Sequence, residues 1–148
     1  MEKYIGVKII EAKAMTAIDA EKVLNRPIDV SNADSNRNGY LVRYPDGYKS
    51  WSPKKAFDKA YWPLNGMTFG LAIELMKKGF KVARKGWNGK GIFIELQVPD
   101  KNSKMTHPYI FIDTTGLLGD NKYAPKDRVP WLASQTDMLS DDWCVVSE

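Results

Sequence analysis

The sequence predicts an α+β protein with mostly antiparallel sheets and short helices, built as a small N-terminal α+β domain followed by a second domain. Three observations predict this class. Apolar and polar residues alternate with a period of two in runs such as 92–98. Turn residues such as Pro45-Asp46-Gly47 separate these runs. The segments with helical spacing, such as 17–25, are short.

The first predicted domain spans residues 1–62 and contains a strand, a helix, a hairpin and a second helix. Residues 4–12 predict the strand, and residues 26–38 predict a polar loop. Thr16 is the expected N-cap of the helix at 17–25, because Asp19 follows it at capping-box spacing. The hairpin strands are expected at 40–44 and 48–51, and Ser52 should cap a short helix with Pro53 as its first residue.

The second predicted domain spans residues 67–148, after a boundary at 62–66. Thr68 should cap a helix that ends at Gly79. Its expected buried stripe is Phe69, Ile73, Met76 and Phe80. Strands are expected at 80–85, 91–98, 109–113 and 143–146, with a loop at 114–128 and a short helix after Ser134.

Composition limits the possible classes of function. Apolar residues make up 43% and charged residues 27%, as is usual in globular proteins. The net charge of +4 includes no long basic run, so duplex nucleic acid is not an expected partner. Cys144, which we expect to be buried, and His107 are the only residues of their types, which rules out an internal disulfide and a Cys/His zinc site. No metal, cofactor or membrane partner is expected.

The stretch 83–91, ARKGWNGKG, has two interpretations. Asn88-Gly89 predicts a type I′ hairpin turn, which by itself explains both residues. Trp87, however, should be partly exposed at such a corner, between the cations Arg84, Lys85 and Lys90. Glycines 86, 89 and 91 would let a ligand reach backbone N–H groups. An indole beside cations and amides is a common way to hold a nucleotide.

The stretch 130–137, PWLASQTD, is the second candidate site. Trp131 precedes a polar cluster formed by Ser134, Gln135, Thr136 and Asp137. A helix N-terminus attracts anions, but Ser134 and Asp137 also fit a capping box that needs no ligand. Two tryptophans beside two polar loops suggest one shared pocket, although Trp131 also fits a core position.

Sequence motifs give little support to catalysis. No P-loop, nucleophile elbow or HExxH motif occurs. The pair Asp141 and Asp142 fits an acidic turn better than an acid–base pair, and His107 fits a surface loop. Asp113 could accept hydrogen bonds from ribose hydroxyls or begin a turn with Thr114.

Two long motifs carry a resemblance to a known family. MTFGLAIELMKKGFKVARKGWNGKG and VPWLASQTDMLSDDWCVV, in this order, closely resemble the Thoeris anti-defence 2 family of bacteriophage proteins over residues 67–146. The resemblance implies a homotetrameric sponge with ligand pockets between subunits. It implies that the ligand is the cyclic ADP-ribose isomer made by TIR-domain sensors and, for some relatives, a cyclic oligonucleotide signal of CBASS.

The resemblance also implies roles for individual residues. Trp87 and Trp131 would form aromatic walls, and Phe69 fits either the same pocket or the core. The remaining expected ligand contacts come from the two loops: Arg84, Asn88, Gly89, Ala133, Ser134, Gln135, Thr136 and Asp137. The segment HPYIFID departs from the family pattern, so His107, Tyr109 and Asp113 are not assigned ligand contacts. Residues 1–62 lie outside the minimal family and resemble a small domain found at the N-terminus of phage proteins.

The predicted function is therefore that of a non-catalytic anti-defence protein in the cytoplasm of the infected bacterial host. It would sequester the cyclic signal and prevent activation of the Thoeris effector. The alternatives are a single-stranded nucleic-acid-binding protein and an enzyme that degrades the signal. Salt-sensitive affinity for oligonucleotides would indicate the first, and cleaved product would indicate the second.

Overall fold

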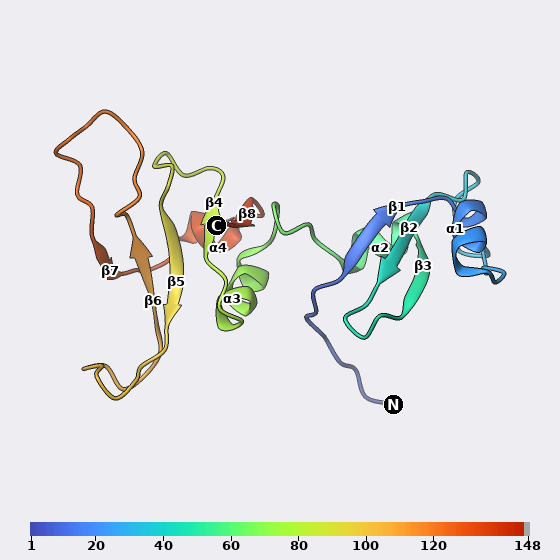
Figure 1. The fold of residues 1–148 in the computed structure, drawn as a ribbon, viewed down its shortest axis with the longest axis horizontal. Helices are drawn as coiled ribbons and strands as arrows, with labels where there is room; N and C mark the ends of the chain where they lie inside the picture. The colour runs from blue at the N-terminus through green and yellow to red at the C-terminus, as the bar shows by residue number, and fades with distance from the viewer. Residues whose placement is uncertain (147–148) are drawn as a thin grey trace. The chain divides into compact units, whose positions relative to one another are not determined.

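The computed structural model describes residues 1–146 of the chain, which forms two compact units, Met1–Trp62 and Pro63–Glu148. Both contain an antiparallel sheet and two short helices, so the predicted α+β class is confirmed (Figure 1). No helix within residues 1–146 has the length and apolar character needed to cross a bilayer.

The first unit is built on a three-stranded sheet with the order β1-β2-β3. The strands are β1 (Glu11–Ala14), β2 (Gly39–Arg43) and β3 (Lys49–Pro53), and the helices are α1 (Ala17–Leu24) and α2 (Lys54–Ala60). The predicted hairpin turn is confirmed, since Gly47 has a φ of 86° and Asp46 accepts a hydrogen bond from the Tyr48 N–H at 2.9 Å. Thr16 caps α1 as predicted, accepting from the Asp19 N–H.

The core of the first unit lies on both faces of this sheet. Val42 is fully buried, and Tyr40 stacks on Phe57 of α2 with 4.0 Å between ring centroids. Trp51, opposite Leu41 and therefore on the other face, donates its indole N–H to the Met15 carbonyl before α1. One helix is thus tied to each face of the sheet.

Two predictions in the first unit are wrong. The strand expected at 4–12 begins only at Glu11. Because Glu11 pairs with Arg43, an extension of this register would place Ile9 opposite Pro45, which has no N–H and lies in the turn. Ser52 is not a helix cap, because β3 continues through Pro53 and α2 begins at Lys54.

The second unit is built on a five-stranded antiparallel sheet with the order β7-β6-β5-β4-β8. The strands are β4 (Val82–Arg84), β5 (Phe93–Gln97), β6 (Tyr109–Asp113), β7 (Arg128–Pro130) and β8 (Trp143–Val145), and the helices are α3 (Phe69–Lys77) and α4 (Gln135–Leu139). The predicted strand at 109–113 is confirmed with its bounds, and the other three are shorter than predicted. In this strand order β8 pairs with β4, although the two strands are far apart in sequence.

The helix α3 begins and ends as predicted but buries a different face. Thr68 accepts from the Leu71 N–H, and Gly79 has a φ of 93° just after the last turn. Its buried residues are Ala72, Leu75 and Met76, so of the predicted stripe only Met76 is fully buried. The helix packs on β4, β5 and β8 of the sheet, whose residues Val82, Ile94 and Trp143 are fully buried. Two adjacent apolar stripes are present in this helix, and only packing decides which one faces the sheet.

The sequence predicts a loop over 114–128 and no strand at the position of β7. Its three residues are all exposed, it lies at the edge of the sheet, and it ends in a proline. A short exposed strand lacks the apolar alternation by which a strand is recognised.

Candidate functional site

The loop between β4 and β5 holds the first candidate stretch, and it does not form the predicted turn. A type I′ turn needs positive φ at both central residues, but neither Asn88 nor Gly89 has one. The positive φ occurs at Gly91 instead, at 82°. The strands pair at Val82 and Ile94, so the chain between them is a long loop whose shape depends on other contacts.

Four aromatic residues meet beside this loop, and we call Phe69, Trp87, Trp131 and Trp143 the aromatic cluster. The ring centroids are 5.1–6.1 Å apart in the contacting pairs, mostly edge to face. Trp143 of β8 is fully buried, while Trp87 and Trp131 are half-buried. The buried indole thus supports two indoles that keep part of their surface in solvent.

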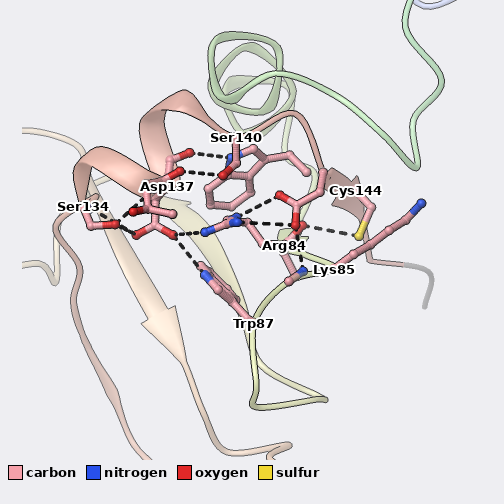
Figure 2. Close-up of polar contacts among 12 residues, drawn as sticks. Arg84, Lys85, Trp87, Ser134, Asp137, Ser140 and Cys144 are labelled. Carbon is pink, nitrogen blue, oxygen red and sulfur yellow. Dashed lines mark hydrogen bonds and ion pairs between the residues drawn. The ribbon is translucent and has the colours of Figure 1, made fainter.

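The carboxylate of Asp137 connects this cluster to the start of α4. Its Oδ2 accepts from the Ser134 N–H at 3.1 Å and the Ser134 hydroxyl at 2.7 Å, and Ser134 accepts from the Asp137 N–H in return. This confirms the predicted capping box. Asp137 Oδ1 accepts from Arg84 Nη1 at 2.9 Å and from the Trp87 indole N–H at 3.1 Å (Figure 2). Both carboxylate oxygens of Asp137 therefore accept hydrogen bonds from protein groups.

A second carboxylate, from Asp142, holds the other side of Arg84. Asp142 Oδ1 accepts from Arg84 Nε at 2.8 Å, and Oδ2 accepts from the Gly86 backbone N–H at 2.7 Å. These groups meet because β8 pairs with β4, which places Arg84 opposite Trp143. The side chains of Arg84 and Asp137 are each 13% exposed.

The electrostatics of the two carboxylates follow from these contacts. Burial by itself would raise the pKa of Asp137, but the hydrogen bonds from Ser134, Arg84 and Trp87 lower it to about 2. The hydrogen bond from Arg84 lowers the pKa of Asp142 as well. Both carboxylates are therefore ionised at neutral pH, and together they outweigh the single positive charge of Arg84.

The end of the loop is held by further contacts. Lys90 Nζ donates to the carbonyls of Lys85 at 2.7 Å and Trp87 at 3.0 Å, and the Leu118 N–H donates to the Lys90 carbonyl at 2.9 Å. A Cβ at Gly91 would lie 2.1 Å from the Gly116 carbonyl oxygen, so the two backbones approach as closely as glycine allows. The loop is thus held at its start, middle and end.

The expected site residues fall into two groups. Phe69, Arg84, Trp87, Trp131, Ser134 and Asp137 come together in or beside the aromatic cluster. The others are their neighbours in sequence: Asn88 is exposed and Gly89 half-buried in the loop, Ala133 is half-buried just before α4, and Gln135 and Thr136 are exposed in the first turn of α4. Asp142 and Trp143 are absent from the expected set. The pairing of β8 with β4 brings them into the site, and no local pattern marks it.

Residues outside the site have structural partners of their own. Asp113 is 4% exposed and accepts from Arg128 Nε at 2.7 Å and from the Thr115 N–H at 2.9 Å, so the turn that it begins closes on Thr115. Burial would raise its pKa, but these hydrogen bonds lower it to about 2. Cys144 is half-buried instead of buried. Within residues 1–146, no three acidic, histidine or cysteine side chains are grouped to hold a metal ion.

Comparison with known proteins points to one family. Residues 67–146 match the family model described as the Thoeris anti-defense 2-like domain. The protein named Thoeris anti-defense 2 of Bacillus phage SP01 is 37% identical over 94 residues, which cover 55% of this chain and 96% of that protein. The matched residues include every member of the aromatic cluster and both carboxylates bound to Arg84.

Proposed function

Since the chain belongs, through residues 67–146, to the Thoeris anti-defense 2-like family, we propose that it is a phage anti-defence protein that sequesters a cyclic nucleotide signal. The proposed ligand is a cyclic ADP-ribose isomer, with cyclic oligonucleotides of CBASS as further candidates. Binding would occur in the cytoplasm of the infected host, where the signal is made. The ligand would be held intact, which would prevent activation of the Thoeris effector.

The aromatic cluster is the observation that carries this proposal. Trp87 and Trp131 are half-buried, stand at 64° to each other and have ring centroids 6.0 Å apart. Each contacts the buried Trp143 edge to face, and because both are only half-buried, part of each indole remains available to a ligand. An indole can stack on a nucleobase without any sequence-dependent hydrogen bond. Such a wall suits a nucleotide-derived ligand.

Polar groups for the phosphates and riboses would come from the loop between β4 and β5 and from the first turn of α4. The side chains of Asn88, which follows Trp87, and of Gln135 and Thr136, which follow Ser134, are exposed and can donate hydrogen bonds. Ser134 and Asp137 are already joined in the capping box, which fixes the backbone from which Gln135 and Thr136 project. We propose these three exposed side chains as the polar contacts of the site.

Sequestration needs affinity and no chemistry. A nanomolar dissociation constant corresponds to about −12 kcal/mol, and a preformed site helps to reach it because little ordering remains to be done on binding. The carboxylate of Asp137 accepts four hydrogen bonds and has a pKa of about 2, which makes it a poor proton donor or acceptor near neutral pH. These properties support a binding role.

We further propose that the protein acts as a homo-oligomer, a homotetramer with sites completed between subunits. Leu132, which follows Trp131, is 91% exposed, and Leu139, the last residue of α4, is 82% exposed. Exposed apolar side chains that gather in one patch often mark an interface, and we propose that these two belong to such a patch. An adjacent subunit would cover these leucines and close the site beside Trp131.

The test is recovery of the ligand after capture. The 148-residue protein is mixed with the cyclic ADP-ribose isomer and passed through a filter that retains protein, and the retained fraction is then heated. We expect the nucleotide to disappear from the filtrate and to return with unchanged mass and chromatographic retention. Cleaved product would show an enzyme, and an unretained nucleotide would refute capture of this ligand. Salt-sensitive retention of linear oligonucleotides alone would support the single-strand-binding alternative.

A further inference from the structure

We infer that Arg84, Asp137 and Asp142 are positioning residues that hold the Trp87 wall of the site. The family resemblance implies direct ligand contacts for Arg84 and Asp137, and we assign them this positioning role instead. The inference rests on the proposed function for its ligand, whereas its geometric part stands on the described contacts alone.

The contacts form a closed ring of hydrogen bonds. The Gly86 N–H donates to Asp142, Asp142 accepts from Arg84, and Arg84 donates to Asp137, at 2.7, 2.8 and 2.9 Å. Asp137 also accepts from the indole N–H of Trp87 at 3.1 Å. Because residues 86 and 87 are joined by a peptide bond, the ring closes through the chain itself. It therefore fixes both the backbone before Trp87 and the direction of its indole (Figure 2).

The charged groups of this ring form ion pairs with one another. Arg84 faces two carboxylates, and its side chain is only 13% exposed. A phosphate approaching Arg84 would also meet the negative charges of Asp137 and Asp142, which lie 2.9 and 2.8 Å from the guanidinium nitrogens. An arginine whose charge is neutralised and whose side chain is 13% exposed is better suited to holding protein groups than to attracting an anion.

The ring gives binding a specific advantage. An indole that can rotate must be ordered when a ligand stacks on it, and that ordering lowers the affinity. In this protein the indole is already ordered by a charge-assisted hydrogen bond to Asp137. Loss of any member of the ring should therefore weaken binding even when the lost group never touches the ligand.

The first experiment needs no ligand. The chain has five tryptophans, whose indole N–H resonances can be followed by NMR, and the Trp87 resonance is identified by its loss in Trp87→Phe. We expect Asp142→Asn to shift or broaden the Trp87 resonance, although Asp142 does not contact that indole. Asp141→Asn, the same change at the adjacent exposed residue, is the control and should leave it in place. An unmoved Trp87 resonance in Asp142→Asn would overturn the ring.

The second experiment separates positioning from direct contact. Lysine keeps the positive charge of Arg84 but cannot bond two carboxylates in the same fork geometry. We expect Arg84→Lys to weaken binding of the cyclic ADP-ribose isomer about tenfold or more, with the same dependence of affinity on salt concentration as the native protein. Near-native affinity in Arg84→Lys, or a reduced salt dependence in Arg84→Gln, would show direct contact with phosphate instead.

The two experiments fail in different ways. If the native protein binds no cyclic nucleotide, the proposed function is wrong, while the NMR result still decides whether the ring positions Trp87. If Asp142→Asn does not fold, Arg84→Lys breaks the same ring, and its Trp87 resonance decides the question. A native Trp87 resonance in a folded Arg84→Lys protein would then refute the inference.

Discussion

At the scale of single residues, the two half-exposed indoles carry the proposed function. Among residues 1–146, no group accepts a hydrogen bond from the indole N–H of Trp131. Every buried side-chain polar atom in that part of the chain has a hydrogen-bond partner, so this unpartnered N–H is not a buried one. The N–H of Trp131 is therefore accessible to solvent and to a ligand. Trp87, by contrast, has its N–H bound to Asp137 and offers only ring surface. The two indoles would thus contribute differently to one site.

Replacement of Trp131 should weaken ligand binding strongly. Base–aromatic stacking is worth about 1–3 kcal/mol per base, so Trp131→Ala should raise the dissociation constant by about one to two orders of magnitude. Calorimetry with the cyclic ADP-ribose isomer measures this change. Trp62→Ala, at an exposed tryptophan of the first unit, is the matched control and should bind as the native protein does. Equal losses in both variants would speak against a specific wall.

The stability of the protein should depend on pH through its hydrogen-bonded carboxylates, Asp137 and Asp113. The pKa values of Asp137 and Asp113 are lowered to about 2 in the folded state, below about 3.9 for an aspartate in an unfolded chain. A lowered folded-state pKa stabilises the fold above pH 4, and this stabilisation is lost as the pH falls from about 4 to 2. The urea midpoint should therefore stay constant from pH 7 to about 4 and then decrease.

The variant Asp137→Asn identifies the share of this one carboxylate. It should have a lower urea midpoint than the native protein at pH 7, and the two midpoints should converge as the pH approaches 2. Midpoints that differ by the same amount at every pH would show that the ionisation of Asp137 does not contribute.

At the scale of elements, the loop between β4 and β5 is the part of the fold that the site depends on most. Side chains from α4 and from the residue before β8 hold its beginning, and the backbone of the loop after β6 holds its end at Gly91. A loop with so many external contacts has little freedom of its own. It can serve as a rigid wall although it has no regular secondary structure.

Substitution of Gly91 tests how closely this loop must pack. Gly91→Ala combines a positive φ of 82° with a Cβ 2.1 Å from the Gly116 carbonyl oxygen, so the backbone must move. Gly79→Ala is the control in the same unit, since Gly79 has a φ of 93° but nothing within 4 Å of the added Cβ. We expect about 1 kcal/mol of destabilisation for Gly79→Ala from the strained φ alone, and a clearly larger loss for Gly91→Ala.

Ligand affinity separates the two glycine variants further. Only Gly91→Ala should weaken binding, because only Gly91 lies in the loop that carries Trp87. Chemical denaturation and calorimetry measure the two effects. A Gly91→Ala protein as stable as Gly79→Ala would show that the loop can adjust at little cost.

At the scale of the whole molecule, the second unit contains the complete aromatic cluster and the ring around Arg84. It also carries the exposed leucines of the proposed subunit interface. Association and ligand binding are therefore expected to depend on the same unit and to be linked.

The leucine pair provides the test of association. Leu132→Asp and Leu139→Asp should shift the protein to a smaller species in analytical ultracentrifugation, because a buried charge at an interface is unfavourable. Ligand affinity should decrease with them if a second subunit completes the site. The control is Leu118→Asp, at a 72% exposed leucine in the loop after β6, which should leave the mass unchanged. A native mass in both interface variants would contradict the proposed interface.

Local signals in the sequence predicted much of the fold. Thr16, Thr68 and Ser134 each cap a helix as their spacing indicates, and the Pro45-Asp46-Gly47 turn joins the expected strands. Contacts between distant residues explain the misses. The strand at 4–12 is shortened because its partner turns at Pro45, and the type I′ turn at Asn88-Gly89 gives way to the longer loop that Asp137 and Asp142 hold.

The sequence by itself determined the α+β class, the caps of α1, α3 and α4, the two candidate stretches and, through their residues, the family resemblance. These features depend on neighbours within a few positions, where side-chain chemistry and backbone preference act directly. Only the tertiary structure decided that Arg84 is bound by two carboxylates and that Trp143 supports the other indoles. Both depend on the pairing of β8 with β4, and no interaction within either segment specifies its partner strand.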